Sequence, residues 1–213
     1  MPSPINIKQL NQDLQSHPDS QYVAYLIQGF MYGFDTKVSD INIPSKECKN
    51  LLSALKQKDA VQELIEKEVQ KGFLSGPYVK LPFVSYRVSP IGIAEGKYLL
   101  KKRLIVDLSS PHDSETHRSI NELIDKEECS LSYVTIDDAI QNIIEHGRGA
   151  SMCKADISDA FKLIPICPSQ YHLFCIKWCD VYYFYNKLAF GCRSSPKIFD
   201  EFSKAICWIA ENI

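Results

Sequence analysis

The stretch Lys154-Ala155-Asp156-Ile157-Ser158-Asp159-Ala160-Phe161 decides the fold that we predict for this chain. It overlaps a short apolar run, Met152 to Ile157, that is typical of a central strand. A carboxylate at the end of a strand is rigidly held, which suits a Mg²⁺ ion that shares its oxygen ligands with substrate phosphates. A purely structural interpretation stays open, in which the stretch supplies a strand end, a helix cap and a core ring.

A second block further along the chain reads Leu188-Ala189-Phe190-Gly191-Cys192-Arg193-Ser194-Ser195-Pro196. Glycine has no Cβ, so the backbone at Gly191 can pass close to a nucleotide. Ser195-Pro196 is typical of a helix start, and the free amides at such a start favour anions. The alternative is an ordinary turn between a strand and a helix.

The third block, Lys101-Lys102-Arg103-Leu104-Ile105-Val106-Asp107-Leu108, predicts a strand from Arg103 to Leu108. The planar guanidinium of Arg103 suits bidentate contact with a phosphate. Seven basic residues and one acid, Glu95, lie between positions 71 and 103. The basic residues are Lys71, Lys80, Arg87, Lys97, Lys101, Lys102 and Arg103.

Aromatic residues are interleaved with these basic residues, namely Phe73, Tyr78, Phe83, Tyr86 and Tyr98. Basic groups beside exposed rings indicate binding of phosphates and unstacked bases. The competing interpretation is a solvated basic face whose aromatic rings are turned into a core. The formal net charge of −2 gives no global sign of nucleic-acid binding.

Composition predicts a folded intracellular protein of 213 residues with 45% hydrophobic content. The eight cysteines form no Cys-x-x-Cys pair, which argues against structural zinc and favours reduced thiols. No apolar run is long enough to span a bilayer, so we expect no membrane partner. Cytoplasm and nucleus are not distinguished.

Local patterns predict a mixture of helices and hairpin strands. The first expected helix begins at Asp19-Ser20 and ends near Gly33, and the second begins at Asp59 and ends at Gly72. The third begins with the capping-box pattern Thr135-Ile136-Asp137-Asp138 and ends at Gly147. The expected hairpin joins Leu173–Trp178 to Val181–Leu188 across Cys179-Asp180.

The three blocks, in this order, resemble the fingers and palm of a retroelement reverse transcriptase. Further stretches are similar to the tyrosine-recombinase (DIRS-type) retrotransposon group. They are His17-Pro18-Asp19, Tyr25-Leu26-Ile27-Gln28-Gly29-Phe30, Gly76-Pro77, Arg87-Val88-Ser89-Pro90-Ile91-Gly92, Leu104-Ile105-Val106-Asp107-Leu108-Ser109-Ser110-Pro111, Cys129-Ser130-Leu131-Ser132-Tyr133-Val134 and Arg193-Ser194-Ser195-Pro196-Lys197-Ile198-Phe199.

The resemblance implies an α+β fold of the right-hand polymerase type, truncated before the palm hairpin that carries the second and third metal aspartates. It implies a helical amino-terminal region over 1–58, fingers over 59–131 and 166–190, and a partial palm over 132–165 and 191–213. The departures are a displaced basic residue at Lys97, Ala189 where the family has proline, and Cys192 after Gly191.

The resemblance also assigns roles to single residues. Asp156 matches the first catalytic, metal-binding aspartate, and the carbonyl of Ile157 is expected to be a second Mg²⁺ ligand. Phe161 matches a ring that leaves no room for a 2′-hydroxyl and so predicts deoxyribonucleotides. The remaining residues expected to contact the nucleotide are Arg103, Asp159, Ala160, Phe190 and Gly191.

The implied activity is RNA-directed DNA polymerisation by two-metal phosphoryl transfer, with an RNA or DNA template-primer and deoxynucleoside triphosphates as partners. The 213 residues contain no aromatic-x-Asp-Asp box. We therefore expect weak or absent Mg²⁺ binding and no activity from this chain by itself, with a partner chain or a further carboxy-terminal half completing the site. The alternative is a non-catalytic, retroelement-derived protein that binds nucleic acid or another protein.

Overall fold

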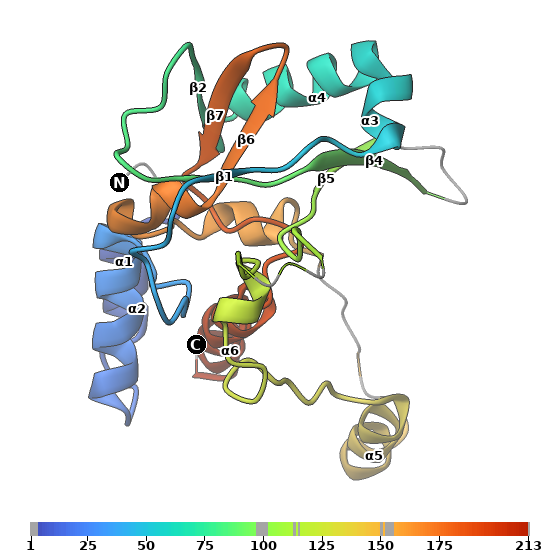
Figure 1. The fold of residues 1–213 in the computed structure, drawn as a ribbon. Coiled ribbons are helices and arrows are strands. Elements are labelled where there is room, and N and C mark those ends of the chain that lie inside the picture. The colour runs from blue at the N-terminus through green and yellow to red at the C-terminus, as the bar shows by residue number, and fades with distance from the viewer. Residues whose placement is uncertain are drawn as a thin grey trace.

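The computed structural model describes residues 4–96, 102–112, 114, 116–149, 151 and 156–212 of the chain. A mixed sheet with two helices on one side lies above a group of helices (Figure 1). The α-helices are α1 (Ile7–Asp13), α2 (Ser20–Tyr32), α3 (Leu52–Lys56), α4 (Lys58–Gln70), α5 (Ile136–His146) and α6 (Ser195–Asn212). The 3₁₀ helices are η1 (Asn121–Leu123), η2 (Ala160–Leu163) and η3 (Pro168–Leu173).

The strands form two sheets. They are β1 (Lys46–Glu47), β2 (Leu74–Tyr78), β3 (Arg87–Val88), β4 (Ile91–Glu95), β5 (Lys102–Val106), β6 (Cys175–Trp178) and β7 (Val181–Tyr185). The larger sheet has the order β1-β3-β6-β7-β2, and β4 pairs with β5 in an antiparallel ribbon. Cys179 and Asp180 both have positive φ, as a two-residue hairpin turn between β6 and β7 requires. The predicted hairpin is therefore confirmed, with strands shorter than the predicted Leu173–Trp178 and Val181–Leu188.

Helix α4 covers one side of the strands. Its buried residues Val61 and Ile65 lie one turn apart on one face of the helix, which contacts β2 and β5. The helix begins at Lys58, one residue before the predicted start at Asp59. Asp59 lies in the first turn instead, where a carboxylate opposes the positive end of the helix dipole.

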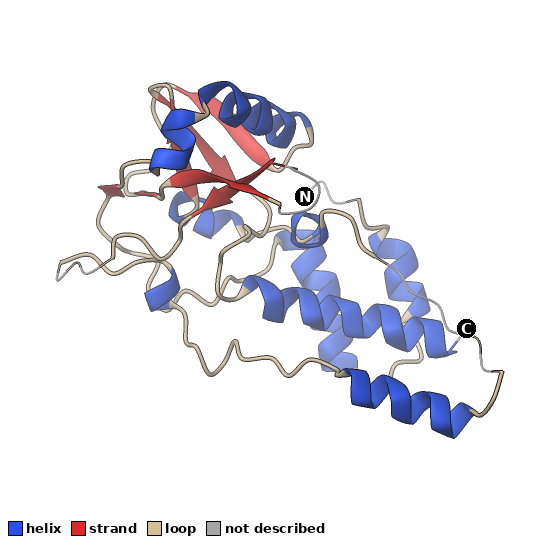
Figure 2. Cartoon of the chain, turned by 90° about the vertical axis from the view of Figure 1, so that its right-hand side faces the viewer, coloured by secondary structure: helices blue, strands red, loops and turns tan. Residues whose placement is uncertain are grey.

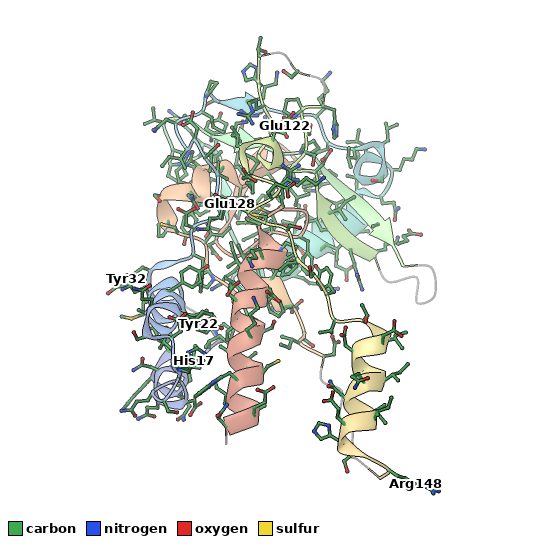
Figure 3. All side chains as sticks on the ribbon, turned by 90° about the horizontal axis from the view of Figure 1, so that it is seen from below. His17, Tyr22, Tyr32, Glu122, Glu128 and Arg148 are labelled. Carbon is green, nitrogen blue, oxygen red and sulfur yellow. The ribbon has the colours of Figure 1, made fainter. Side chains whose placement is uncertain are left out.

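The lower group consists of α1, α2 and α6. Helix α2 begins as predicted, with the Asp19 carboxylate accepting a hydrogen bond from Tyr22 N at 2.9 Å, and Gly33 follows its last residue with φ of 97°. Figure 3 shows Tyr22 and His17 on the side that faces α6. The Tyr22 hydroxyl donates to the Glu201 carbonyl, so α2 is tied to α6.

Helix α5 stands apart from the rest of the chain (Figures 1 and 2). The predicted capping box is present, because the Thr135 hydroxyl accepts from Asp138 N and the Asp138 carboxylate accepts from Thr135 N. None of its residues is buried, and Ile136 and Ile144 are 80% and 66% exposed. Among the described residues, no helix is both long enough and apolar enough to cross a membrane.

Two regions differ from the sequence-based picture or lie outside it. The region 1–58, expected to be helical, also contains strand β1, which pairs with β3 in parallel. Residues 152–155 of the expected central strand lie outside the described residues, and Asp156 and Ile157 have irregular backbone. The proposed division into fingers and partial palm stays a prediction.

Candidate functional site

The segment from Asp156 to Leu163 forms an irregular turn followed by η2. Asp159 adopts left-handed backbone geometry with φ of 53°, a conformation that aspartate tolerates better than most residues. Its carbonyl accepts the amide of Lys162 at 2.7 Å. The Asp159 carboxylate pairs with the ammonium of Lys71, with 2.6 Å between Oδ2 and Nζ. The residue expected to help seat a triphosphate is therefore already held by the end of α4.

The ring of Phe161 lies between two other rings. Its centroid is 4.9 Å from that of Phe190 and 5.7 Å from that of Phe199 on α6. Phe190 is 48% exposed, so this cluster borders solvent. The structure thus brings together two residues, Phe161 and Phe190, that the sequence placed in separate motifs.

Gly191 lies against strand β5. It has φ of 96°, and a Cβ at this position would come within 2.8 Å of the Val106 carbonyl oxygen. Both properties require glycine here, one because of backbone conformation and the other because of close approach. In the structure, therefore, Gly191 makes a backbone contact with β5, the strand that also carries Arg103.

Asn121 fixes this loop from the other side, and sequence reasoning missed it. Its side-chain amide donates to the Ser109 hydroxyl and to the Gly191 carbonyl, both at 2.9 Å, and its oxygen accepts from Arg193 N at 2.9 Å. The residue is 8% exposed. The sequence around Asn121 does not indicate these hydrogen bonds, because the tertiary fold brings the three partners together.

Arg103 lies on β5 opposite Ala94, and its side chain is exposed. Val106, the neighbour of Gly191, is three residues along the same strand, a distance of about 10 Å. Lys102 lies 3.9 Å from Glu95, whereas Arg103 makes no ion pair within the described part of the chain. The guanidinium is therefore exposed on the strand whose other end contacts Gly191. Lys97 and Lys101 lie outside the described residues.

The basic stretch is only partly a surface feature. Arg87 is 4% exposed, donates to the Arg118 carbonyl, and has a pKa lowered by burial, so it does not offer a surface phosphate contact. Tyr78, Phe83 and Tyr86 pack against a small core cluster with Phe184. The competing interpretation of these rings as core residues therefore holds for this part of the stretch.

The described residues provide only part of the set of Mg²⁺ ligands that the resemblance implies. Asp156 is exposed, and the described residues contain no group of three or more histidine, cysteine, aspartate or glutamate residues arranged for a metal ion. Mg²⁺ needs several hard oxygen ligands in octahedral geometry. The carboxylate of Asp156 and the carbonyl of Ile157 alone do not fit a two-metal site.

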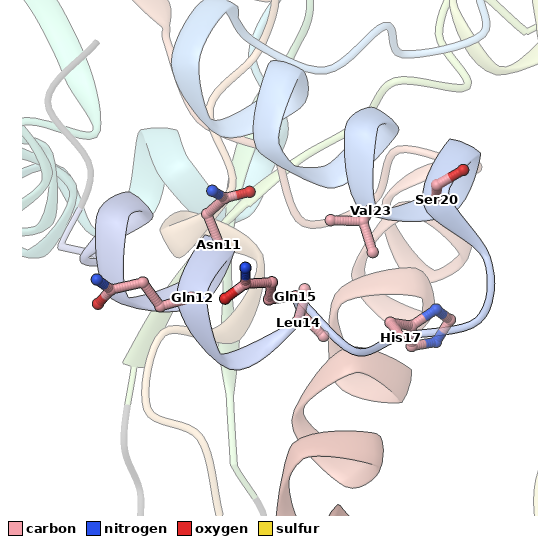
Figure 4. A pocket seen from close by; sticks show the side chains of 7 residues that line it. All are labelled: Asn11, Gln12, Leu14, Gln15, His17, Ser20 and Val23. Atoms are coloured by element: carbon pink, nitrogen blue, oxygen red, sulfur yellow. The ribbon is translucent and has the colours of Figure 1, made fainter.

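One hollow in the described surface lies away from the predicted site residues. A cavity of about 440 Å³ between α1 and α2 is lined by Asn11, Gln12, Gln15 and His17 (Figure 4). Its polar groups are neutral amides, one imidazole and the hydroxyl of Ser20. It contains none of the predicted site residues, so cavity size does not mark the candidate site in this chain.

Comparison with known proteins rests on the fold. No family model matches the chain, and no curated protein matches its sequence. Two crystal structures of the protease-reverse transcriptase of prototype foamy virus match it at 14% identity, a selenomethionine-labelled CSH mutant with a TM-score of 0.51 and the native protein with 0.50. The chain has a reverse transcriptase-like fold.

The match covers 97% of this chain and 27% of the mutant protein, and 93% and 26% for the native protein. The predicted α+β fold of the fingers-and-palm type is confirmed. The chain spans about a quarter of the length of the proteins it matches. At 14% identity this likeness shows the fold alone, so any chemical role is argued from the residues of this chain.

Proposed function

We propose that this chain is the fingers and first half of the palm of a retroelement RNA-directed DNA polymerase, similar to the DIRS-type group. In this role it holds a deoxynucleoside triphosphate and the template-primer. The observation that carries the proposal is the convergence of Asp159, Phe161, Phe190 and Gly191, which belong to two distant motifs, beside the strand that carries Arg103. The reverse transcriptase-like fold supports it.

The roles proposed for the residues follow their surroundings. Arg103 is exposed and suits the triphosphate, because a guanidinium binds phosphate oxygens in pairs. Phe161 is backed by Phe199 and Phe190, so its ring resists displacement by a 2′-hydroxyl. Gly191 is exposed, so a base would contact its backbone on the side away from β5, and Ala160 with Asp159 forms the turn beneath the triphosphate.

Nucleotide binding tests the first role. We expect the chain to bind dATP more tightly than ATP, by up to about 100-fold, the usual limit for a pocket that rejects one added hydroxyl. Phe161→Ala is expected to remove most of this difference, whereas Phe83→Ala, which removes a ring that packs against the second core cluster, is expected to leave the ratio unchanged. Equal affinities of the unaltered chain for dATP and ATP would contradict the proposal.

Arg103→Ala tests the phosphate contact. Loss of a charge-assisted hydrogen bond is expected to weaken dATP binding by about tenfold or more. The matched control is Lys102→Ala on the same strand, since Lys102 lies near Glu95 and is expected to cost less. Binding measured at two salt concentrations should fall less steeply in the Arg103 variant than in the unaltered chain. An effect of Lys102→Ala that equals that of Arg103→Ala would count against the assignment.

We propose further that the chain alone does not extend a primer, because one carboxylate cannot organise two Mg²⁺ ions. Incubation with a template-primer, Mg²⁺ and deoxynucleotides is expected to give no product. Incorporation that disappears in Asp156→Ala would show this part of the proposal to be wrong. It would leave the nucleotide-binding roles standing.

A second candidate function is favoured by α5. Its exposed isoleucines form an apolar surface, which suits a non-catalytic role as a protein-binding partner. The binding assays distinguish the two functions. A chain with this second function binds neither dATP nor a template-primer, whereas the first proposal requires both.

A further inference from the structure

Lys162 is a buried cation that none of the proposed roles uses. It is 3% exposed, and its ammonium lies 3.0 Å from the Glu68 carboxylate on α4 and 3.7 Å from the ring centroid of Tyr185 on β7. Burial lowers the pKa of Lys162, and the charge of Glu68 opposes that shift. The side chain of Glu68 is 25% exposed, so the pair sits at the edge of the core.

A second ion pair joins the same two segments, but here the cation lies at the end of α4 and the anion lies in the turn. Lys71 lies one turn after Glu68 on the chain, at the end of α4, and binds Asp159. The turn formed by residues 159–162 is thus held at its first residue by a cation and at its last residue by an anion. The Lys71–Asp159 pair is exposed and contributes little, whereas the Lys162–Glu68 pair is largely shielded from water.

The neighbours of Phe161 and Lys162 lie in different parts of the fold. Phe161 contacts Phe190 and Phe199, while Lys162 contacts Glu68 and Tyr185. Because the two residues are adjacent, the direction of one side chain constrains the direction of the other. Holding the ammonium of Lys162 against α4 therefore keeps the ring of Phe161 on the side of Phe190.

Stability alone does not account for a charged residue at this position. An apolar side chain of similar length would fill the space beside the Tyr185 ring, and such replacements of buried ion pairs are often neutral or stabilising. What an apolar side chain lacks is a fixed partner, so it leaves the backbone of the turn free to shift. Buried ion pairs in some proteins are retained because they select one conformation.

We propose that Lys162 is a positioning residue that, through Glu68, fixes the 159–162 turn and the ring of Phe161, and so sets discrimination between deoxyribonucleotides and ribonucleotides. The part that concerns nucleotides rests on the proposed function. The part that concerns the turn rests on the contacts of Lys162 alone.

The test compares Lys162→Met with Lys67→Met in the full chain. Lys67 also pairs with a glutamate of α4, Glu63 at 2.5 Å, but the pair is exposed, so the same change of side chain is made outside the core. The Glu68 side chain is 25% exposed, but the Oε2 atom that faces Lys162 is buried, so the folding of the Lys162 variant is checked first by circular dichroism. Glu68→Gln is the second variant, since its amide oxygen still accepts from the ammonium.

The first measurement is amide hydrogen exchange of the turn. The amides of Lys162 and Ile164 donate to the carbonyls of Asp159 and Phe161. In Lys162→Met their exchange is expected to be at least tenfold faster, with an intermediate change in Glu68→Gln. Amides of the β6–β7 hairpin should exchange as in the unaltered chain, because a general loss of stability would accelerate both regions. Unchanged exchange of the turn in a folded Lys162 variant would overturn the proposal.

The second measurement is the ratio of the dissociation constants for ATP and dATP. Lys162→Met is expected to lower this ratio several-fold toward that of Phe161→Ala, and Lys67→Met to leave it unchanged. A ratio that responds to Phe161→Ala and not to Lys162→Met would refute the positioning role and leave the proposed function intact. Absence of nucleotide binding by the unaltered chain would refute the proposed function, and the exchange of the turn would still decide whether Lys162 fixes it.

Discussion

Gly191 is required for two independent physical reasons, and they can be separated by experiment. Its φ of 96° lies in the left-handed region, and its missing Cβ leaves room for the Val106 carbonyl. Gly72 shares the first property without the second, because its φ is 73° and no atom lies within 4 Å of a Cβ built there. The two glycines therefore form a matched pair.

Gly72→Ala is expected to cost about 1–2 kcal/mol of unfolding free energy, the price of left-handed backbone for an ordinary residue. Gly191→Ala is expected to cost at least about 1 kcal/mol more, because a backbone carbonyl cannot rotate out of the way as a side chain would. Urea denaturation measures both. Equal costs would show that β5 moves away from the loop without penalty.

Asn121 joins residues that are far apart in the chain through its three side-chain hydrogen bonds. Asn121→Ala is expected to lower the unfolding free energy by about 3 kcal/mol, at roughly 1 kcal/mol for each bond. Ser109→Ala removes only one of the three bonds and is expected to cost about 1 kcal/mol. If the two substitutions cost the same in chemical denaturation, Asn121 does not hold the Gly191 loop.

At the scale of an element, helix α5 has a well-formed N-terminal cap but leaves its apolar side chains exposed. Its capping box follows from local sequence, which is why it was predictable. An isolated helix of this length is marginal in water, since most helical stability comes from packing of an apolar face. Ile140 and Ile143 are 48% and 42% exposed, so the apolar residues of α5 find little packing among the described residues.

The double substitution Ile140→Gln with Ile144→Gln tests this surface. The unfolding free energy is expected to change by less than about 0.5 kcal/mol, because neither side chain is buried. Self-association, measured by sedimentation velocity at increasing concentration, is expected to decrease as the apolar area is lost. For comparison, Ile198→Ala in α6, which is 2% exposed, is expected to cost about 2–5 kcal/mol. A large loss of stability in the double variant would mean that α5 packs against the rest of the chain.

At the scale of the whole molecule, the sequence predicted what local rules determine. The β6–β7 turn, the start of α2 and the capping box of α5 all depend on residues close together in the chain. The three sequence blocks, through their resemblance to reverse transcriptases, predicted the α+β architecture that the fold comparison confirms. They also named Phe161 and Phe190, which the structure places in contact.

What escaped prediction depends on contacts between distant segments. The pairing of Lys71 with Asp159 and the burial of Lys162 join α4 to a turn that follows nearly ninety residues later. The burial of Arg87 beside the Arg118 carbonyl is of the same kind. Charged residues are usually exposed, and the packed fold alone shows that Lys162 and Arg87 are buried.

The hydrophobic core is continuous from the amino-terminal helices to α6. Phe30 is fully buried, with its ring centroid 4.9 Å from that of Phe202 on α6 and 5.2 Å from that of Phe34. The same cluster of buried residues includes Trp178 of the sheet. The amino-terminal helical region thus shares its core with the remainder, which predicts a single cooperative transition.

The two tryptophans of the chain, Trp178 in β6 and Trp208 in α6, report on the two regions separately. Single-tryptophan variants, Trp208→Phe and Trp178→Phe, provide the two probes. In each background, Phe30→Ala is expected to lower the unfolding free energy by about 3–5 kcal/mol, because a buried ring is lost. The shift should be the same for both probes. Tyr32→Ala, on the same helix but 64% exposed, is expected to shift neither. A Phe30 effect seen only by Trp208 would show that the helical group unfolds apart from the sheet, because a shared core transmits the loss to both.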